Sequence, residues 1–207
     1  MFNMKSLFHR ALCALMLTVA AGGAFAGPTY HVTVNTASLA ADISGNLDFA
    51  LGNFGDAPEA IVTLSNFSGA FGSETDRFGN VGGAIPAAVT LVNSSGMQYL
   101  TQAITLGGML GFDVNFSGDF ETTASLIDSN FNVSLFNDTM DAYLAENFIS
   151  FALVPVTGGN PSNVIVNFDR SLADVGIAAE VPEPSELLLM LTGLAMMGAL
   201  VRRRSQR

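Results

Sequence analysis

The sequence predicts an all-β protein: an antiparallel β-sandwich or jelly roll of about ten short strands, followed by one C-terminal transmembrane helix. Three observations lead to this prediction. Apolar and polar residues alternate along short segments, as at Leu110, Phe112, Val114 and Phe116. Clusters of Gly, Asn, Asp, Ser and Pro separate these segments, without an intervening helical period. An uncharged apolar stretch then follows the last of them.

Ten segments fit strands, and in chain order they are residues 30–34, 46–51, 60–67, 87–93, 99–106, 110–116, 131–135, 148–155, 163–168 and 175–179. We expect the glycine-rich stretch 69–86 to be a long loop and residues 140–147 to form a helical turn. The dipeptide Asn-Phe recurs six times at irregular spacing. Each phenylalanine is expected to face the core or end a strand, beside a turn-forming or outward asparagine.

Residues 1–26 have the pattern of a secretory signal peptide. Lys5 and Arg10 form a positive n-region, and residues 11–21 are an uncharged apolar run. Ala24 and Ala26 supply the small residues that signal peptidase accepts, which predicts cleavage before Gly27. The alternative is a retained anchor or the first helix of the domain.

The C-terminal segment 187–201 carries no charge and is bounded by Glu186 and Arg202. As a helix it would span about 22 Å, short of the roughly 30 Å hydrocarbon core of a bilayer. The cluster of Arg202, Arg203 and Arg204 is expected to stay cytoplasmic by the positive-inside rule, with the body of the protein on the other side. Two prolines disfavour helix just before this segment.

The motif Pro182, Glu183 and Pro184, with the hydrophobic helix and arginine-rich tail of residues 181–207, resembles the PEP-CTERM sorting signal of Gram-negative bacteria. The resemblance implies transient anchoring at the inner membrane and processing near the motif by exosortase, a transpeptidase-like membrane enzyme. It transfers a sorting role and no catalytic residue. Residues 45–69 also look like the central region of small proteins of this family. The alternative for the motif is a rigid linker.

The middle of the chain, residues 27–180, is the predicted exported domain and is strongly acidic. It has two arginines, no lysine and sixteen acidic residues, a net charge of −14. Such a body repels phosphate backbones, so nucleic-acid binding is excluded, and so is lysine-based covalent catalysis. The one cysteine, Cys13, lies in the predicted signal peptide, so the exported domain has neither thiol nor disulfide.

A search for catalytic or metal-binding patterns finds none that is complete. His31 is the domain's one histidine; a Ser-His-Asp triad around it stays open, although Gly-x-Ser-x-Gly is absent. A glycosidase carboxylate pair cannot be read from sequence.

Asp128, Asn130 and Asn132 have the first spacings of a calcium loop but lack its glycine and terminal glutamate. The acid pair Glu74 and Asp76 is a second calcium candidate, with surface charge favoured for both sets.

Carbohydrate binding and glycosylation also stay open. Glycan-binding modules present exposed Trp or Tyr rings, and the chain has three tyrosines and no tryptophan, which disfavours this activity. Five Asn-x-Ser/Thr triplets begin at Asn66, Asn93, Asn115, Asn132 and Asn137. Members of the PEP-CTERM family are regarded as candidates for glycosylation, so modification at some of these positions is a hypothesis.

We therefore expect a non-enzymatic bacterial surface or extracellular-matrix protein, exported, held transiently at the inner membrane and then released. No cofactor is expected, with calcium kept as an alternative. The expected partners are signal peptidase, exosortase, the inner membrane and, by the family resemblance, exopolysaccharide in biofilms. The alternative function is a secreted carbohydrate- or calcium-binding module. A secreted hydrolase is a third hypothesis that no motif supports.

Overall fold

The computed structural model describes residues 27–39, 43–53, 55–93 and 96–178, and within them the chain is all-β. It contains twelve strands and one 3-10 helix. They are β1 (Tyr30–Asn35), β2 (Ser44–Asn53), β3 (Ile61–Ser68), β4 (Phe71–Phe78), β5 (Val81–Gly83), β6 (Val89–Val92), β7 (Gln98–Thr105), β8 (Met109–Ser117), η1 (Asp119–Glu121), β9 (Ser129–Asn137), β10 (Tyr143–Val154), β11 (Asn163–Phe168) and β12 (Ala173–Ile177).

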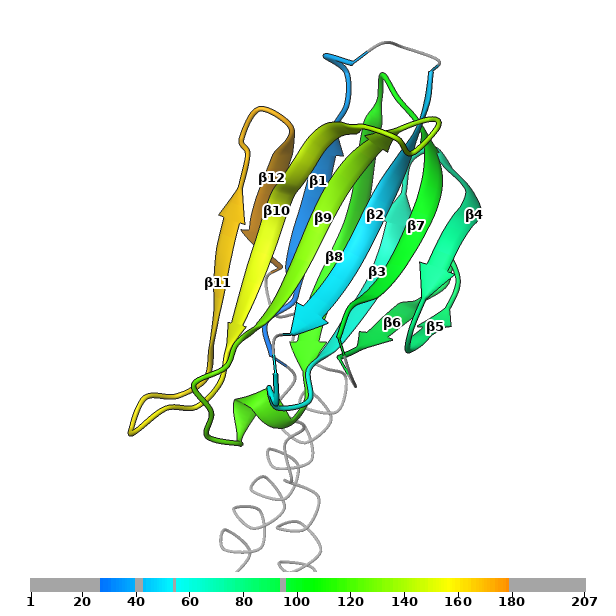
Figure 1. Cartoon of the computed structure of the whole chain (residues 1–207). Coiled ribbons are helices and arrows are strands. Elements are labelled where there is room, and N and C mark those ends of the chain that lie inside the picture. Colours follow the sequence, from blue (N-terminus) through cyan, green and yellow to red (C-terminus); the bar gives the residue numbers. More distant parts are fainter. Residues whose placement is uncertain (1–26, 40–42, 54, 94–95, 179–207) are drawn as a thin grey trace, which may run out of the picture.

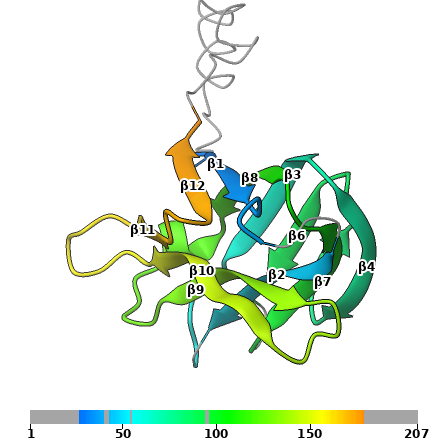
Figure 2. The same cartoon turned by 90° about the horizontal axis from the view of Figure 1, so that it is seen from above.

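The strands form two antiparallel sheets packed as a sandwich, which confirms the predicted architecture at this level (Figures 1 and 2). The β1 sheet has the order β12-β1-β8-β3-β6-β5, and the β2 sheet has the order β11-β10-β9-β2-β7-β4. The β2 sheet faces the viewer in Figure 1. In the first eight strands the pairs are nested, since β1 pairs with β8, β2 with β7 and β3 with β6.

The core lies between the sheets and is built mainly from phenylalanine, leucine and valine. Phe112 and Phe116 of β8 reach across to the β2 sheet. The ring of Phe112 lies edge-on to Phe49 at 5.2 Å between centroids, and Phe116 lies 5.0 Å from Phe151 and 6.1 Å from Phe131. All five rings are fully buried. Burying one such side chain stabilises a fold by about 1.5–3 kcal/mol.

Each of the ten predicted strand segments overlaps one observed strand, because period-two alternation reports directly which side chains face the core. The expectation for Asn-Phe is also confirmed where the structure describes it. Phe116, Phe131 and Phe148 are buried, and Phe67 and Phe168 pack against the core. Two of the partner asparagines, Asn66 and Asn147, have left-handed backbones at irregularities of β3 and β10.

The prediction of a long loop over residues 69–86 is wrong, because this stretch contains β4 and β5. Most side chains of β4 are exposed, so the strand lacks the alternation that identified the others. It is an edge strand, and its conformation comes from pairing with β7 and from the contacts of Arg77. The twelve observed strands therefore exceed the predicted ten by these two.

The helical turn predicted at residues 140–147 is also wrong. A tight turn follows β9, and β10 begins at Tyr143. The side chain of Asn137 holds this turn: its Oδ1 accepts from the Asp141 backbone N–H at 3.1 Å, and its Nδ2 donates to the Asp141 carboxylate at 2.5 Å. An asparagine that binds the backbone of the following turn competes with helix formation.

Within the described ranges, no helix is long and apolar enough to cross a membrane. The expected transmembrane helix at 187–201 lies outside those ranges, and so do residues 1–26 and the rest of the tail. These expectations therefore stay predictions.

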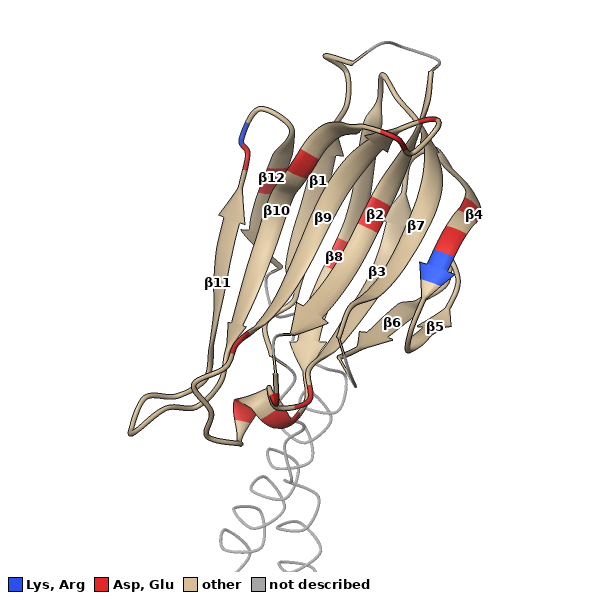
Figure 3. Ribbon diagram, in the orientation of Figure 1, with Lys and Arg blue, Asp and Glu red and all other residues tan. Residues whose placement is uncertain are grey.

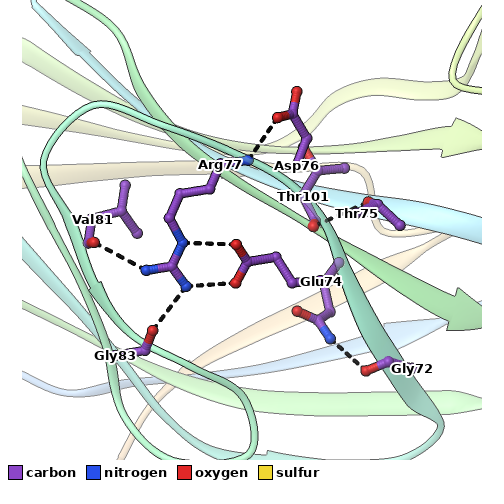
Figure 4. A network of polar contacts seen from close by, with 9 residues as sticks. Gly72, Glu74, Thr75, Asp76, Arg77, Val81, Gly83 and Thr101 are labelled. Carbon is purple, nitrogen blue, oxygen red and sulfur yellow. Dashed lines mark hydrogen bonds and ion pairs between the residues drawn. The ribbon is translucent and has the colours of Figure 1, made fainter.

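Arg77 ties the end of β4 to β5 in the opposite sheet (Figure 4). Its Nε and Nη2 donate to the two oxygens of Glu74 at 2.8 and 2.5 Å. Its Nη1 and Nη2 donate to the carbonyls of Val81 and Gly83 at 3.0 and 2.8 Å. The hydrogen bonds from Arg77 lower the pKa of the Glu74 carboxyl, and the carboxylate raises the pKa of Arg77. One guanidinium thus joins the two sheets at their open edge.

Arg77→Met should lower the free energy of unfolding by about 1–3 kcal/mol, because it removes a bidentate ion pair and leaves two strand carbonyls without their donor. The measurement is urea unfolding at low and moderate salt. Arg170→Met is the matched control, since Arg170 lies 5.9 Å over the ring of Phe168 and forms no ion pair in the part of the chain that the structure describes. Equal effects of the two substitutions would refute the role given to Arg77.

Candidate functional site

The outer face of the β2 sheet presents a broad polar surface. Because strand side chains alternate, the inward Phe49, Phe131 and Phe151 direct their neighbours outward. One row crosses five strands in register: Tyr99, Ala50, Asn132, Ser150 and Asn167. A second row holds Thr101, Asp48 and Ser134. The strands β7, β9 and β11 carry no charged residue, and their ribbons are tan in Figure 3. We call this surface the amide face.

Asp48 is the acidic residue within these two rows and is half-buried. The hydroxyl of Thr101 donates to its Oδ1 at 2.7 Å. Burial raises the pKa of Asp48, the hydrogen bond from Thr101 opposes that shift, and the negative charge of Asp76 adds to it. The amide face therefore contains a carboxyl group that is easier to protonate than a surface aspartate.

Two stacked aromatic pairs lie on the amide face. Phe78 of β4 stacks on Tyr99 of β7, with ring centroids 5.7 Å apart and planes 19° apart. Phe136 of β9 stacks on Tyr143 of β10, at 4.2 Å and 30°. Phe78 and Tyr143 are more than half exposed. The Tyr99 hydroxyl donates to Asp76 at 3.0 Å, and this bond raises the pKa of the phenol.

The sequence did not predict these aromatic pairs, because the number of tyrosines does not show where their rings lie in the fold. Tyr143 is exposed and Tyr99 is partly exposed on the same face, and each stacks on a phenylalanine. Flat rings can stack on the apolar faces of sugar rings, and amides and hydroxyls can exchange hydrogen bonds with sugar hydroxyls. The surface thus has the chemistry of a binding face for neutral, hydroxyl-rich ligands.

A depression of about 430 Å³ borders the amide face between the start of β10 and the end of β11. Its lining includes Glu146, Asn147, Asn167 and Asp169. Asn167 belongs to the first row of the amide face, so the hollow continues that surface at one end. Asp169 accepts from the backbone N–H of Ser171 at 2.9 Å, and this bond lowers the pKa of its carboxyl.

His31 lies on the outer face of the other sheet. Its Nδ1 is 2.6 Å from Oδ1 of Asp113, whose Oδ2 accepts from the Asn66 amide at 2.6 Å. Ser65 pairs with Asp113 on the side away from His31. It is thus two strands from the imidazole, about 10 Å away. Among the described residues no serine donates to His31, so this cluster joins three strands and does not form the triad weighed above.

The calcium candidates do not converge. Asn130 and Asn132 lie on β9 with Asp128 just before it, so successive side chains are about 7 Å apart along an extended strand. One ion cannot bind all three. Glu74 gives both oxygens to Arg77, and Asp76 binds Tyr99. Within the described ranges, no three His, Cys, Asp or Glu side chains are grouped as metal ligands.

Four of the five Asn-x-Ser/Thr asparagines use their amide N–H groups inside the fold. Asn66 donates to Asp113, Asn93 to Pro58 and Ser129, Asn115 to Gly27, and Asn137 to Asp141. Asn93 is also buried. The fifth, Asn132, lies in the middle of the amide face. Glycosylation stays a hypothesis, with Asn132 as the position where it would cover the candidate ligand surface.

The residues predicted to direct sorting lie outside the described ranges, except Gly27. These are Ala24, Ala26, Pro182, Glu183, Pro184, Arg202, Arg203 and Arg204. Gly27 is the first described residue and packs beside β8 and η1. The structure places the two ends of the domain together: Tyr30 of β1 pairs with Ile177 of β12, and the Ala178 N–H donates to the Thr29 carbonyl at 2.7 Å.

No protein-family model, no curated protein and no solved structure matches the chain.

Asp48→Asn should make the protein more stable at pH 7 and reduce the pH dependence of its stability. A carboxyl group whose pKa is raised in the folded state contributes stability that is present below its unfolded pKa. That contribution is lost as the pH rises through the folded pKa. Asparagine keeps the acceptor for Thr101 but cannot ionise, so the stability of the variant should not fall as the pH rises through this range. Thermal unfolding from pH 3.5 to 7.5 measures the difference.

Asp56→Asn is the control for this prediction, because it removes one negative charge from an exposed position. Parallel stability curves for wild type and Asp48→Asn across that pH range would contradict the assignment to Asp48.

Proposed function

We propose that the protein is an exported, non-enzymatic component of a bacterial cell surface or extracellular matrix. A signal peptide carries residues 27–180 across the inner membrane. The tail at 181–207 then anchors the chain transiently, and exosortase processes it near Pro182, Glu183 and Pro184. Signal peptidase, exosortase and the inner membrane are transient partners, and exopolysaccharide is the proposed partner at the destination.

The observation that carries this proposal is the adjacency of the two ends of the sandwich. Thr29 and Ala178 are joined by a backbone hydrogen bond, and β1 and β12 are neighbours in one sheet. Neighbouring strands are about 4.8 Å apart. Segments attached at both ends can therefore reach one membrane from the same end of the domain. If the two ends lay at opposite poles of the sandwich, the two targeting segments would be separated by its whole length and could not reach one membrane from the same end.

The negative surface charge supports the proposed extracellular location. The described part of the domain has two arginines and no lysine, and Asp and Glu dominate its charged positions (Figure 3). A strongly negative surface keeps a secreted protein soluble and repels nucleic acids. The absence of cysteine from residues 27–207 makes its stability independent of redox conditions.

Glu183→Ala should block processing, so that the chain stays in the inner membrane with Arg207 attached. The measurement is fractionation of native cells followed by intact mass spectrometry of both chain ends. Glu186→Ala is the matched control, since it removes the neighbouring carboxylate and leaves the tripeptide intact. The control should be processed as the wild type is. Recovery of the wild-type chain from the cytosol with Met1 attached would refute export, and equal processing of Glu183→Ala would refute the motif.

We propose as a second candidate that the domain binds neutral polysaccharide on the amide face. The two aromatic pairs and the uncharged row that runs from Tyr99 to Asn167 favour it. We also propose that β1–β8 form a jelly roll, which the nested pairing of these strands supports. Because unrelated functions share such folds, the proposal rests on the surface and not on the architecture.

Tyr99→Ala and Tyr143→Ala should each weaken binding of a neutral glucan by about five- to thirtyfold, because each removes a stacking ring worth about 1–2 kcal/mol. The measurement is isothermal titration of the processed chain. An acidic uronate polymer should bind more weakly than the glucan, owing to like charge.

His31→Ala is the control for this titration, because it removes an exposed ring from the opposite sheet. Heat with CaCl₂ alone would point instead to a calcium module. Equal glucan affinity in all three variants, or no heat in wild type, would exclude the amide face as the binding surface.

A further inference from the structure

Gly27 is held tightly against two other parts of the fold. Its carbonyl accepts a hydrogen bond of 2.9 Å from the Asn115 amide of β8. A Cβ atom built at this position would lie 3.1 Å from the Phe116 carbonyl oxygen and 3.3 Å from Oε1 of Glu121. The backbone at residue 27 therefore touches both β8 and η1, and the Glu121 carboxylate lies beside it.

The Glu121 carboxylate has no cationic partner among the described residues. Arg77 is bound to Glu74, and Arg170 lies over Phe168. Glu121 lines a cavity of about 140 Å³, together with Gly27, Tyr30 and Phe116. The titratable groups of that lining are Glu121 and the Tyr30 phenol, and burial raises the pKa of both. A carboxylate at a partly buried site is destabilised by desolvation unless a nearby positive charge offsets it, and Glu121 has no such cation among the described residues.

We propose that Glu121 binds an α-ammonium group, namely the one that appears on Gly27 when residues 1–26 are removed. This inference rests on the signal-peptide cleavage of the proposed function. Hydrolysis breaks the Ala26–Gly27 C–N bond: the oxygen of water joins the Ala26 carbonyl carbon, and the Gly27 nitrogen becomes an amine. An ordinary α-amino group has a pKa near 7.7–8.0, so most of it is protonated at neutral pH.

The new charge forms on an atom bonded to the Gly27 Cα, about 1.5 Å from it. A Cβ atom built on that same Cα would lie 3.3 Å from Oε1 of Glu121, so the carboxylate is a near neighbour of the charged end. In the unprocessed chain the same nitrogen is an uncharged amide. Processing therefore adds an ion pair between the first residue of the domain and η1, and so secures the start of β1 only after the signal peptide has left.

The processed chain offers a direct measurement, because Lys5 is the only lysine of the protein. In the chain from Gly27 to Arg207 the α-amino group is consequently the sole primary amine. Its rate of acylation, followed by intact mass between pH 6 and 10, gives its pKa. The described residues begin at Gly27, so this chain retains the whole sandwich. It can be prepared in detergent by cutting a fusion protein just before Gly27.

The apparent pKa of the amine should be about half a unit to one unit higher in the folded chain than in Glu121→Gln. At pH 7.5 acylation should accordingly be about two- to sevenfold slower in the wild type than in this variant. Asp119→Asn is the matched control, because it removes an exposed charge from the same 3-10 helix and should keep the raised pKa. The wild type in concentrated urea supplies the unfolded reference should Glu121→Gln fail to fold.

Equal amine pKa values in the folded wild type, in Glu121→Gln and in urea would overturn the site. The site would also be overturned if Asp119→Asn lowered the pKa of the amine as much as Glu121→Gln does. The overall negative charge of this region, and not the Glu121 carboxylate, would then cause the shift. The N-terminal residue of the protein from native cells tests the cleavage separately. A different first residue there would refute the proposed processing, while the chain cut before Gly27 would still decide whether Glu121 binds the ammonium.

Discussion

The fold depends on the aromatic contact that β8 makes across the sandwich. Phe112 and Phe116 project from the middle of one sheet and meet Phe49, Phe131 and Phe151 of the other, all fully buried. No disulfide is possible in residues 27–207, so packing of this kind must supply most of the stability. The contact also sets the register of β8 against β1 and β3, because a shift of one residue would turn both rings toward solvent.

The same contact decides what the outer faces present. Where Phe131 and Phe151 point inward, Asn132 and Ser150 must point outward, and the amide face follows from this alternation. On the other sheet, Asp113 lies between the inward Phe112 and Val114 and so meets His31 and Asn66 at the surface. The core and the candidate binding surface are thus two sides of the same strands.

The position of β8 also governs the ends of the domain. It pairs with β1, which in turn pairs with β12, so the first and last strands lie together at one side of the sheet. Because Asn115 and Phe116 belong to β8 and Glu121 follows in η1, the first described residue, Gly27, packs where β8 ends. Packing, placement of the ends and the proposed ammonium site therefore have a common structural cause.

The sequence by itself determined the fold class and ten of the strands, because alternation with period two is a local pattern. It also predicts the two targeting segments, which the described residues do not test. Only the tertiary structure decided that residues 71–78 form a strand, since β4 is polar on both faces and depends on β7 and Arg77. Likewise, only strand order brings Tyr99 beside Phe78, and Glu121 beside Gly27. Contacts between distant strands depend on how the sheets are ordered, and an alternating pattern carries no information about that order.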